Sequence, residues 1–271
     1  MYALSSRASV GAWAAGVAVL LAGGAAPGRA ADPPQEKSWR LEFRILATKQ
    51  DDADAFDAAT KALTDPKRKD ELQKLAEEGK PPPGVAVEKG PGYSWVELAP
   101  AELRALKLDD ESQDFTKQAA KARDAGEPVV TPDPIDDDRQ GNLLFSRPCR
   151  NAKLSKEERD AKKVDYFLLT RLPEKDKALT GEFLTGVKTR EEKGRLFVEF
   201  TMNEKGSAVL KDVTSRNVGR TMAVVVDGRI VSAPKLQSAI SSGGQISGDF
   251  TQKEIDALAD SLRSDMPKKD K

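Results

Sequence analysis

Side chains that commonly carry catalysis are scarce in this sequence. Its 271 residues include no histidine and a single cysteine, Cys149, beside 44 lysines and arginines and 44 aspartates and glutamates. Without histidine the chain has no Ser-His-Asp or Cys-His machinery, no imidazole metal ligand and no side chain whose ordinary pKa lies between 5 and 8. One thiol also excludes an internal disulfide and a cysteine-based zinc site, so the fold must rest on its apolar core.

An acidic cluster offers one pattern for a metal site. Asp136, Asp138 and Gln140 occupy positions one, three and five of a calcium-loop pattern, and Gly141 occupies position six. Position twelve, where such a loop needs a bidentate glutamate, falls on Arg147. A cation at that position argues against calcium binding. The sequence therefore predicts a solvated acidic loop here and no metal site.

Nucleophiles and paired acids define no site either. A Ser-Lys hydrolase would use Ser241 or Ser242, but no lysine is tied to them, and with the two glycines that follow they indicate a flexible turn. A glycosidase-type carboxylate pair stays open, although no acid stands out by its context. Cys149 lies in a basic stretch that would lower its pKa, yet we interpret it as a bystander thiol. The glycine-rich nucleotide motifs and the G-x-S-x-G motif are absent, so no catalytic residue and no cofactor are assigned.

The first thirty residues have the pattern of an export signal. Residues 8–26 carry no charge, follow Arg7 and lead into a small-residue stretch that ends at Ala31. This order is typical of a secretory signal peptide, and we expect cleavage after Ala30. An uncleaved membrane anchor is the alternative, because about 20 apolar residues span a bilayer. With cleavage, we expect a periplasmic or secreted protein that touches the membrane only if the signal is kept.

The net charge argues against nucleic acid as the main partner. The whole chain is formally neutral. Cleavage of residues 1–30 removes Arg7 and Arg29, which leaves 42 basic and 44 acidic side chains and a net charge of −2. Binding to nucleic acid through counterion release needs a basic surface instead.

The N-terminal part of the mature chain predicts alternating strands and helices. Trp39, Leu41, Phe43 and Ile45 alternate with polar residues, which is typical of a half-buried strand. A helix follows, with acids in its first turn and its apolar residues at helical spacing. The predicted strands are 39–47 and 93–98, and the predicted helices are 51–63, a stretch around 72–75, and 100–106.

Residues 109–163 are rich in charge and proline and bury little apolar area. They predict loops with one helix, Phe115 to Ala125.

Residues 164–264 carry the strongest periodic patterns. Asp227-Gly228 separates two apolar runs, which predicts a tight hairpin over 220–234. Asn203 and Thr251 each precede a helical pattern, and Glu254 completes a capping box. Further strands are predicted at 164–172, 194–202 and 244–250, and helices at about 204–218 and 251–264, the second burying Ile255, Leu258 and Leu262. The predicted fold class is α+β, with a small antiparallel or mixed sheet and helices packed on one face.

The last hundred residues resemble the head subdomain of the first periplasmic domain of SecD, or SecDF, an accessory membrane subunit of the bacterial Sec protein-export channel. The matching stretches are 179–187, 213–234 and 243–264, and the middle one covers a helix end, a strand, the Asp-Gly turn and the following Ser-Ala-Pro in the family's spacing. Residues 40–47 resemble the opening strand of the same domain. The resemblance implies a base-like α+β region over 31–108, a linker over 109–163, a head-like domain over 164–264 and a basic tail over 265–271.

The resemblance also implies a function without enzymatic activity. In that family the head is proposed to touch an unfolded polypeptide as it emerges on the far side of the membrane. The implied partners here are unfolded or translocating polypeptides or Sec translocon subunits. The implied contact residues are Arg229, Val231, Ala233, Pro234, Gly243, Gly244 and Gln245. A structural role is the competing interpretation, since Gly228 serves the turn, Val231 the sheet and Pro234 the strand end.

Other function classes stay open beside the resemblance. In SecD the last helix leads into membrane helices of a proton-driven motor, which needs ionisable groups inside the membrane. Here the chain ends after Met266 and Pro267 in a lysine-rich tail, so we expect a stand-alone homologue without that motor. Because a fold does not fix a function, the alternatives are a histidine-free hydrolase and a structural envelope module on the same fold.

Overall fold

The computed structural model describes residues 41–88, 90–110, 113–126, 128–132, 141–174 and 178–267. All of them fall in the unit that runs from Trp39 to Lys271. Within these ranges no helix combines the length and the apolar character needed to cross a bilayer. The predicted signal peptide, with its cleavage after Ala30, lies outside the described residues, as do Asp136, Asp138 and Gln140 of the acidic cluster.

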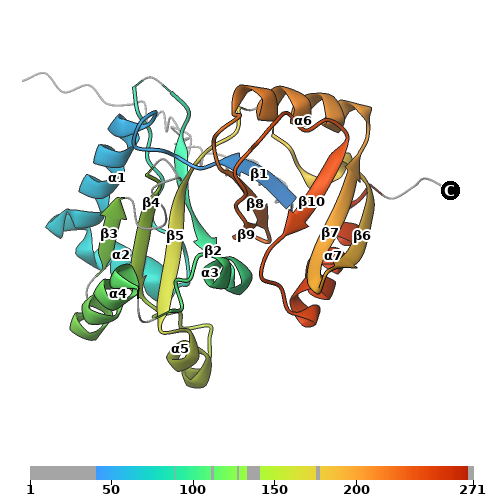
Figure 1. Ribbon diagram of the computed structural model, residues 1–271. Coiled ribbons are helices and arrows are strands. Elements are labelled where there is room, and N and C mark those ends of the chain that lie inside the picture. The colour runs from blue at the N-terminus through green and yellow to red at the C-terminus, as the bar shows by residue number, and fades with distance from the viewer. Residues whose placement is uncertain are drawn as a thin grey trace, which may run out of the picture. The chain divides into compact units, whose positions relative to one another are not determined.

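The larger sheet has seven strands in the order β1-β8-β9-β2-β5-β4-β3 (Figure 1). Neighbouring strands are antiparallel except β9 and β2, which are parallel, so the sheet is mixed. Strands from the beginning and the end of the chain are therefore hydrogen-bonded in one sheet. The strands are β1 (Leu41–Ile45), β2 (Tyr93–Leu98), β3 (Val129–Pro132), β4 (Leu143–Pro148), β5 (Val164–Arg171), β8 (Met222–Val226) and β9 (Arg229–Ser232).

A three-stranded antiparallel sheet, in the order β10-β7-β6, comes from the C-terminal part. Helices α6 and α7 contact this sheet. Their predicted caps are confirmed: the Asn203 side chain accepts a hydrogen bond from Gly206 N at 2.8 Å, and Thr251 with Glu254 forms a capping box. The elements are β6 (Leu184–Glu192), β7 (Arg195–Met202), β10 (Gly243–Ser247), α6 (Glu204–Arg216) and α7 (Gln252–Asp265), with a 3₁₀ turn η3 (Gly181–Phe183) before β6.

The predicted N-terminal helices are confirmed. Helix α1 (Ala53–Thr64) buries the four residues at helical spacing, Ala55, Phe56, Ala59 and Leu63. Helix α2 (Lys69–Glu77) follows a 3₁₀ turn, η1 (Pro66–Arg68), and α3 (Pro100–Ala105) begins with Pro100 at its first position. Proline suits that position because the first helical N–H has no intrahelical partner.

The prediction of loops with one helix for residues 109–163 is wrong. This segment contains α4 (Asp114–Ala125), as predicted, but also β3, β4 and α5 (Lys156–Lys162). Strand β4 lies inside the larger sheet between β3 and β5, and Leu143, Leu144 and Phe145 are almost fully buried. A strand buried on both faces has a continuous apolar run instead of an alternation, and here that run is short and surrounded by charge. The domain boundaries at residues 108 and 163 stay a prediction.

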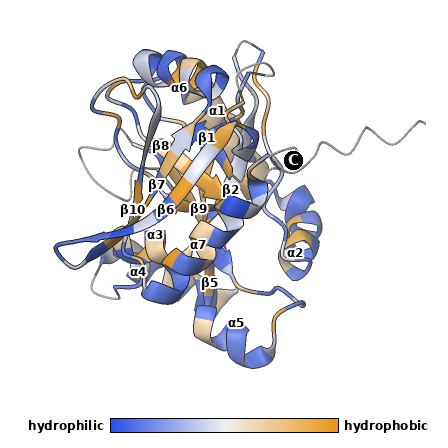
Figure 2. Ribbon diagram, turned by 90° about the vertical axis from the view of Figure 1, so that its right-hand side faces the viewer, coloured by the Kyte–Doolittle hydropathy of each residue, from blue (hydrophilic) through white to orange (hydrophobic). Residues whose placement is uncertain are grey.

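Apolar residues pack on both faces of the larger sheet in three clusters. Along β8, Val224 and Val226 join the cluster that includes the smaller sheet, α6 and α7, whereas Ala223 and Val225 join a second cluster on the other face. The third cluster packs α1 against Trp95 and Phe145. Figure 2 shows hydrophobic residues along the central strands and mostly hydrophilic ones in α5 and at the end of the β6-β7 hairpin. The α+β class with a mixed sheet is confirmed, and the larger sheet exceeds the small one predicted because β1, β2, β4 and β5 join β8 and β9.

Candidate functional site

A tight hairpin supports the first group of predicted contact residues. Asp227 and Gly228 have positive φ angles of 49° and 76°, as the two central residues of a type I′ turn require. The predicted Asp-Gly turn is therefore confirmed. Arg229 follows the turn and is exposed, whereas Val231, two residues later, packs partly against the core.

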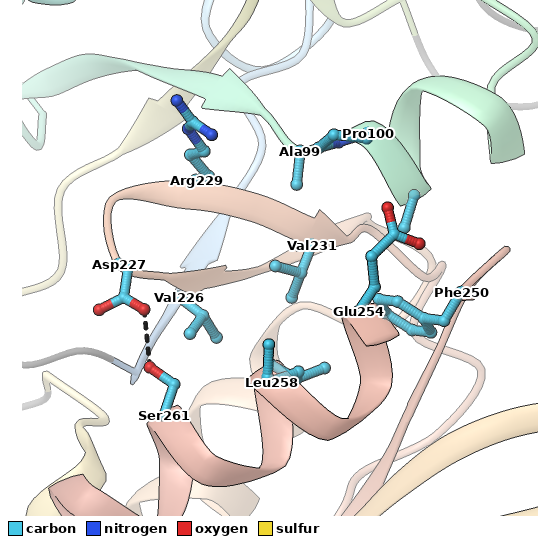
Figure 3. Close-up of a pocket in the computed structure, with 12 residues that line it drawn as sticks. Ala99, Pro100, Val226, Asp227, Arg229, Val231, Phe250, Glu254, Leu258 and Ser261 are labelled. Carbon is cyan, nitrogen blue, oxygen red and sulfur yellow. Dashed lines mark hydrogen bonds between the residues drawn. The ribbon is translucent and has the colours of Figure 1, made fainter. Parts of the chain in front are cut away.

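A cleft of about 260 Å³, here called the hairpin cleft, lies between the β8-β9 hairpin, the start of α3 and helix α7 (Figure 3). Its polar side chains are those of Asp227, Arg229, Glu254 and Ser261. The rest of the lining is apolar and comes from Ala99, Pro100, Ala101, Val226, Val231, Phe250, Ala257 and Leu258.

Two contacts between distant segments fix the hairpin cleft. Ser261 of α7 donates its hydroxyl hydrogen to Asp227 of the turn at 2.6 Å, the dashed contact of Figure 3. Arg104 of α3 donates to Glu254 of α7 at 2.5 Å and to the carbonyl of Asp249 at 2.6 Å. Burial raises the pKa of the Glu254 carboxyl, but hydrogen bonds from Thr251 and Arg104 outweigh burial and leave that pKa below its ordinary value. Glu254 is therefore ionised at neutral pH.

Arg229 is the outer member of a series of ion pairs. Its Nε lies 3.4 Å from Glu97 of β2, and Glu97 also pairs with Lys162 of α5. Lys162 Nζ lies 2.8 Å from Asp165 of β5, whose other oxygen lies 3.4 Å from Nε of Arg147 in β4. Arg147 and Asp165 are buried, so this series connects the rim of the hairpin cleft with the interior of the sheet.

Ala233 and Pro234 do not line the hairpin cleft. Ala233 is buried in the second apolar cluster, with Ile230. Pro234 is exposed, and its carbonyl accepts a hydrogen bond from Met222 N at 3.0 Å. Of the four predicted hairpin residues, the structure therefore places Arg229 and Val231 in one cleft and the other two outside it.

Gly243, Gly244 and Gln245 lie on β10, the edge strand that pairs with β7. A Cβ atom on Gly243 would lie 2.2 Å from the carbonyl oxygen of Phe200, so glycine is required there for the two strands to approach. The hairpin touches β10 at the strand's other end, where the Ser232 hydroxyl donates to the carbonyl of Ser247 at 2.6 Å. The two predicted groups thus belong to different sheets.

Several lining residues of the hairpin cleft were missed by sequence reasoning. Phe250 and Glu254 fall inside the stretch quoted for the resemblance, and Glu254 was predicted only as a cap. Ala99, Pro100 and Ala101 come from a segment more than 120 residues earlier in the chain. No local sequence pattern predicts that this segment lies beside the hairpin, since the parallel pairing of β2 with β9 places it there.

Among the described residues, the hairpin cleft does not assemble a Ser-Lys hydrolase site. The described residues that line the hairpin cleft include Ser261 but no lysine, and a Ser-Lys mechanism needs a lysine beside the hydroxyl. Ser241 and Ser242 are exposed, and the Ser242 carbonyl accepts a hydrogen bond from Met202 N. In the described part of the chain no group of three potential metal ligands is found.

Cys149 has the properties of an inert thiol. Burial, followed by the nearby charge of Asp165, raises its pKa, although its basic neighbours in sequence suggested a lower value. A backbone hydrogen bond from Asn151 and the charge of Lys162 lower the pKa of the thiol but do not offset these two causes. A thiol with a raised pKa forms little of the reactive thiolate at neutral pH.

Comparisons with known proteins place the C-terminal half of the chain. Residues 155–266 match the family model described as the SecDF P1 head subdomain. The protein translocase subunit SecD of Endomicrobium trichonymphae is 35% identical over 106 residues, which is 37% of this chain and 21% of that protein. The corresponding subunit of Elusimicrobium minutum is 34% identical over 165 residues, 60% of this chain and 32% of that protein. The chain thus matches only about a fifth to a third of the length of these relatives.

Solved structures of SecDF also align with this chain. A structure described as a membrane component SecDF that enhances protein export has a TM-score of 0.33 and 19% identity, and the alignment covers 83% of this chain and 93% of that one. This TM-score is too low to support a structural argument. The similarity to the SecDF P1 head subdomain therefore depends on the sequence matches alone.

Proposed function

We propose, from the premise that residues 155–266 form a SecDF P1 head subdomain, that this chain is an exported, non-enzymatic module that contacts polypeptides during protein export. The matched relatives are protein translocase subunits. The proposed partners are unfolded or translocating polypeptides, or subunits of the Sec translocon, on the periplasmic side.

The observation that carries this proposal is the form of the hairpin cleft. Its volume of about 260 Å³ lies below the roughly 300–1,000 Å³ of pockets that enclose small molecules. Apolar walls with charged groups at the rim suit one side chain of an extended polypeptide. Val231, Phe250 and Leu258 would contact that side chain, and Arg229 and Glu254 lie at the rim.

Strand β10 offers a second element for the same partner. It is an edge strand of the smaller sheet and includes Gly243, Gly244 and Gln245. An extended chain can bind an edge strand through main-chain hydrogen bonds, whatever its sequence. This property suits a module that meets many different polypeptides.

Site-specific photo-crosslinking in cells tests the proposal. A photo-reactive residue at Arg229 or at Gln245 should capture translocating chains or Sec subunits, whereas one at Lys188 on the opposite edge strand β6 should not. Ala257→Asp places a charge on the exposed wall of the hairpin cleft, and we expect it to lower the yield at Arg229 several-fold. Ala161→Asp is the matched control, since Ala161 is an exposed alanine of α5.

The possible results separate the three function classes. Equal and negligible crosslinking at all positions, with the protein intact, contradicts the polypeptide-contact proposal and supports a structural envelope module. A purified protein that hydrolyses peptides or esters, and loses this activity with Ser261→Ala, contradicts the non-enzymatic assignment.

A further inference from the structure

A second cavity lies away from the hairpin cleft and shares no lining residue with it. It has a volume of about 460 Å³ and is bounded by β1, the end of β5 and the last turn of α6. Three arginines, Arg44, Arg171 and Arg216, and one acidic residue, Glu174, line it. Each arginine forms an ion pair, Arg44 with Glu42, Arg171 with Asp52 and Arg216 with Asp212. We call it the arginine cavity.

Two of these guanidinium groups, those of Arg171 and Arg216, have N–H donors that are not used in hydrogen bonds to the described residues. Arg171 uses Nε and Nη2 to hold Asp52, and Arg216 uses Nε and Nη2 to bond to Asp212 and its carbonyl. Within the described part of the chain, Nη1 of each makes no hydrogen bond to another group. A charged N–H of this kind donates a strong hydrogen bond to a carboxylate, so the cavity can accept an anionic group.

Exposed apolar side chains gather at the same cavity. Leu172 and Val218 are the large hydrophobic residues found exposed in the described ranges, at 40% and 51%. Leu172 lines the arginine cavity, and Val218 follows Asn217, which also lines it. A ligand that covers these side chains must itself be partly apolar.

A backbone donor of β1 faces the same side. Leu46 N–H bonds to the carbonyl of Thr221, the residue before β8, so in the antiparallel alternation Ile45 N–H points away from β8. Phe43 N–H, which points the same way, bonds to the carbonyl of Leu179 at 3.3 Å. Ile45, a lining residue of the cavity, has no such partner for its N–H among the described residues. This amide lies between two N–H groups that already bond to the chain, Phe43 to Leu179 and Ala47 to Leu169, so it offers one main-chain donor to a ligand.

We propose that the arginine cavity binds an extended acidic segment of a partner polypeptide, with apolar residues next to the carboxylate. The carboxylate bonds to Arg171 and Arg216, an apolar neighbour covers Leu172, and the main chain reaches Ile45. The unused Nη1 donors of Arg171 and Arg216, next to the exposed side chain of Leu172, select this occupant. The site lies outside the hairpin cleft, so it does not depend on the function proposed for that cleft.

Fluorescence anisotropy with two labelled octapeptides tests the proposal. The first alternates valine with aspartate, and the second carries asparagine in place of every aspartate. The full-length protein should bind the acidic peptide at least 10-fold more tightly, and added salt should reduce that difference by screening. Arg216→Gln should raise Kd for the acidic peptide about 5-fold and leave the asparagine peptide unchanged. Leu172→Ser should raise Kd for both peptides.

Two controls make the test specific. Arg190→Gln removes another arginine that is paired with an exposed carboxylate, Glu199, away from the cavity, and should change neither Kd. Ala257→Asp, in the hairpin cleft, should also leave the acidic peptide bound, whatever its effect on crosslinking. Equal affinity for the two peptides, or equal effects of Arg216→Gln and Arg190→Gln, overturns the proposal. Self-association that Arg216→Gln abolishes, without peptide binding, would assign the cavity to a second copy of the chain and also overturn it.

Discussion

The hairpin cleft and the arginine cavity differ in how their charged side chains are held. At the cleft, Arg104 joins α3 to α7, and Arg229 ends the series of ion pairs that reaches β4. At the cavity, Arg216 bonds to a carboxylate only four residues away in sequence, whereas Arg44 bonds to Glu42, two residues away, and also to Ser94 of β2. Ion pairs between distant segments fix the tertiary structure, whereas local pairs do not. The charges of the cleft therefore maintain its shape, whereas Arg216 of the cavity is held only by its own helix and is available to an outside partner.

The largest expected effect on the free energy of unfolding comes from Asp165, near the buried end of the series of ion pairs that starts at the hairpin cleft. Asp165→Asn removes the carboxylate that neutralises Arg147 and Lys162, and Arg147 is only 6% exposed. Leaving a buried charge without its partner costs about 3–5 kcal/mol. Urea unfolding should show this loss. Asp160→Asn, on the exposed face of α5, should change the free energy of unfolding by less than about 0.5 kcal/mol, and similar values for the two variants would contradict the comparison.

Arg171 differs from the other two arginines of the cavity because its ion pair joins distant segments of the chain. Its replacement therefore tests whether such a pair stabilises the fold more than a local one. It holds Asp52, whose side chain is 2% exposed and also accepts hydrogen bonds from Tyr93 OH at 2.6 Å and Thr48 N at 2.8 Å. Because those two bonds remain, Arg171→Gln should cost less than Asp165→Asn, about 2–3 kcal/mol. Burial, followed by the bond to Asp52, raises the pKa of Tyr93 to about 12. Spectroscopic titration of tyrosine checks that Tyr93 keeps this environment in the variant.

The sequence predicts local structure well where periodicity, a turn dipeptide or a cap marks the element. Helix α1, the β8-β9 hairpin and both capped C-terminal helices follow from periodicity, a turn dipeptide and a cap. Strand β4 was missed because its apolar run is too short to stand out among charged neighbours and no turn dipeptide or cap marks it.

The candidate site was predictable only in part. Arg229 and Val231 belong to the hairpin, whose turn is encoded locally. Their opposite wall, Ala99 to Ala101, arrives through the parallel pairing of β2 with β9, which no sequence spacing encodes. The arginine cavity was not predicted at all, since its arginines come from three segments that meet only in the folded chain.

The third prediction concerns pH at the hairpin cleft. The depressed pKa of Glu254 means that the folded state favours its ionised form. That contribution is fully present above the ordinary glutamate pKa of about 4.3 and is lost as the pH falls through the depressed value. Urea unfolding between pH 7 and pH 3 should therefore show a shallower acid loss in Glu254→Gln, which at pH 7 should be less stable by about 0.5–1 kcal/mol.

Asp256→Asn is the matched control for that titration. Asp256 lies on the exposed face of α7 and bonds only to Gln252 among the described residues. Its replacement should leave the slope of stability against pH close to that of the original protein. An equal change of slope in both variants would mean that general charge on α7, and not the bond to Arg104, sets the acid response.

The smallest effect on stability is expected from Arg216→Gln at the arginine cavity. Arg216 is 46% exposed, and its carboxylate partner, Asp212, is 50% exposed on the same helix. Such pairs four residues apart contribute about 0.3–0.5 kcal/mol, so the free energy of unfolding should fall by no more than that. A loss above about 1.5 kcal/mol in urea unfolding would show that Arg216 has a structural role like that of Arg147. A near-neutral result means that this guanidinium is not needed to hold the fold, which is the condition for assigning it to a bound carboxylate.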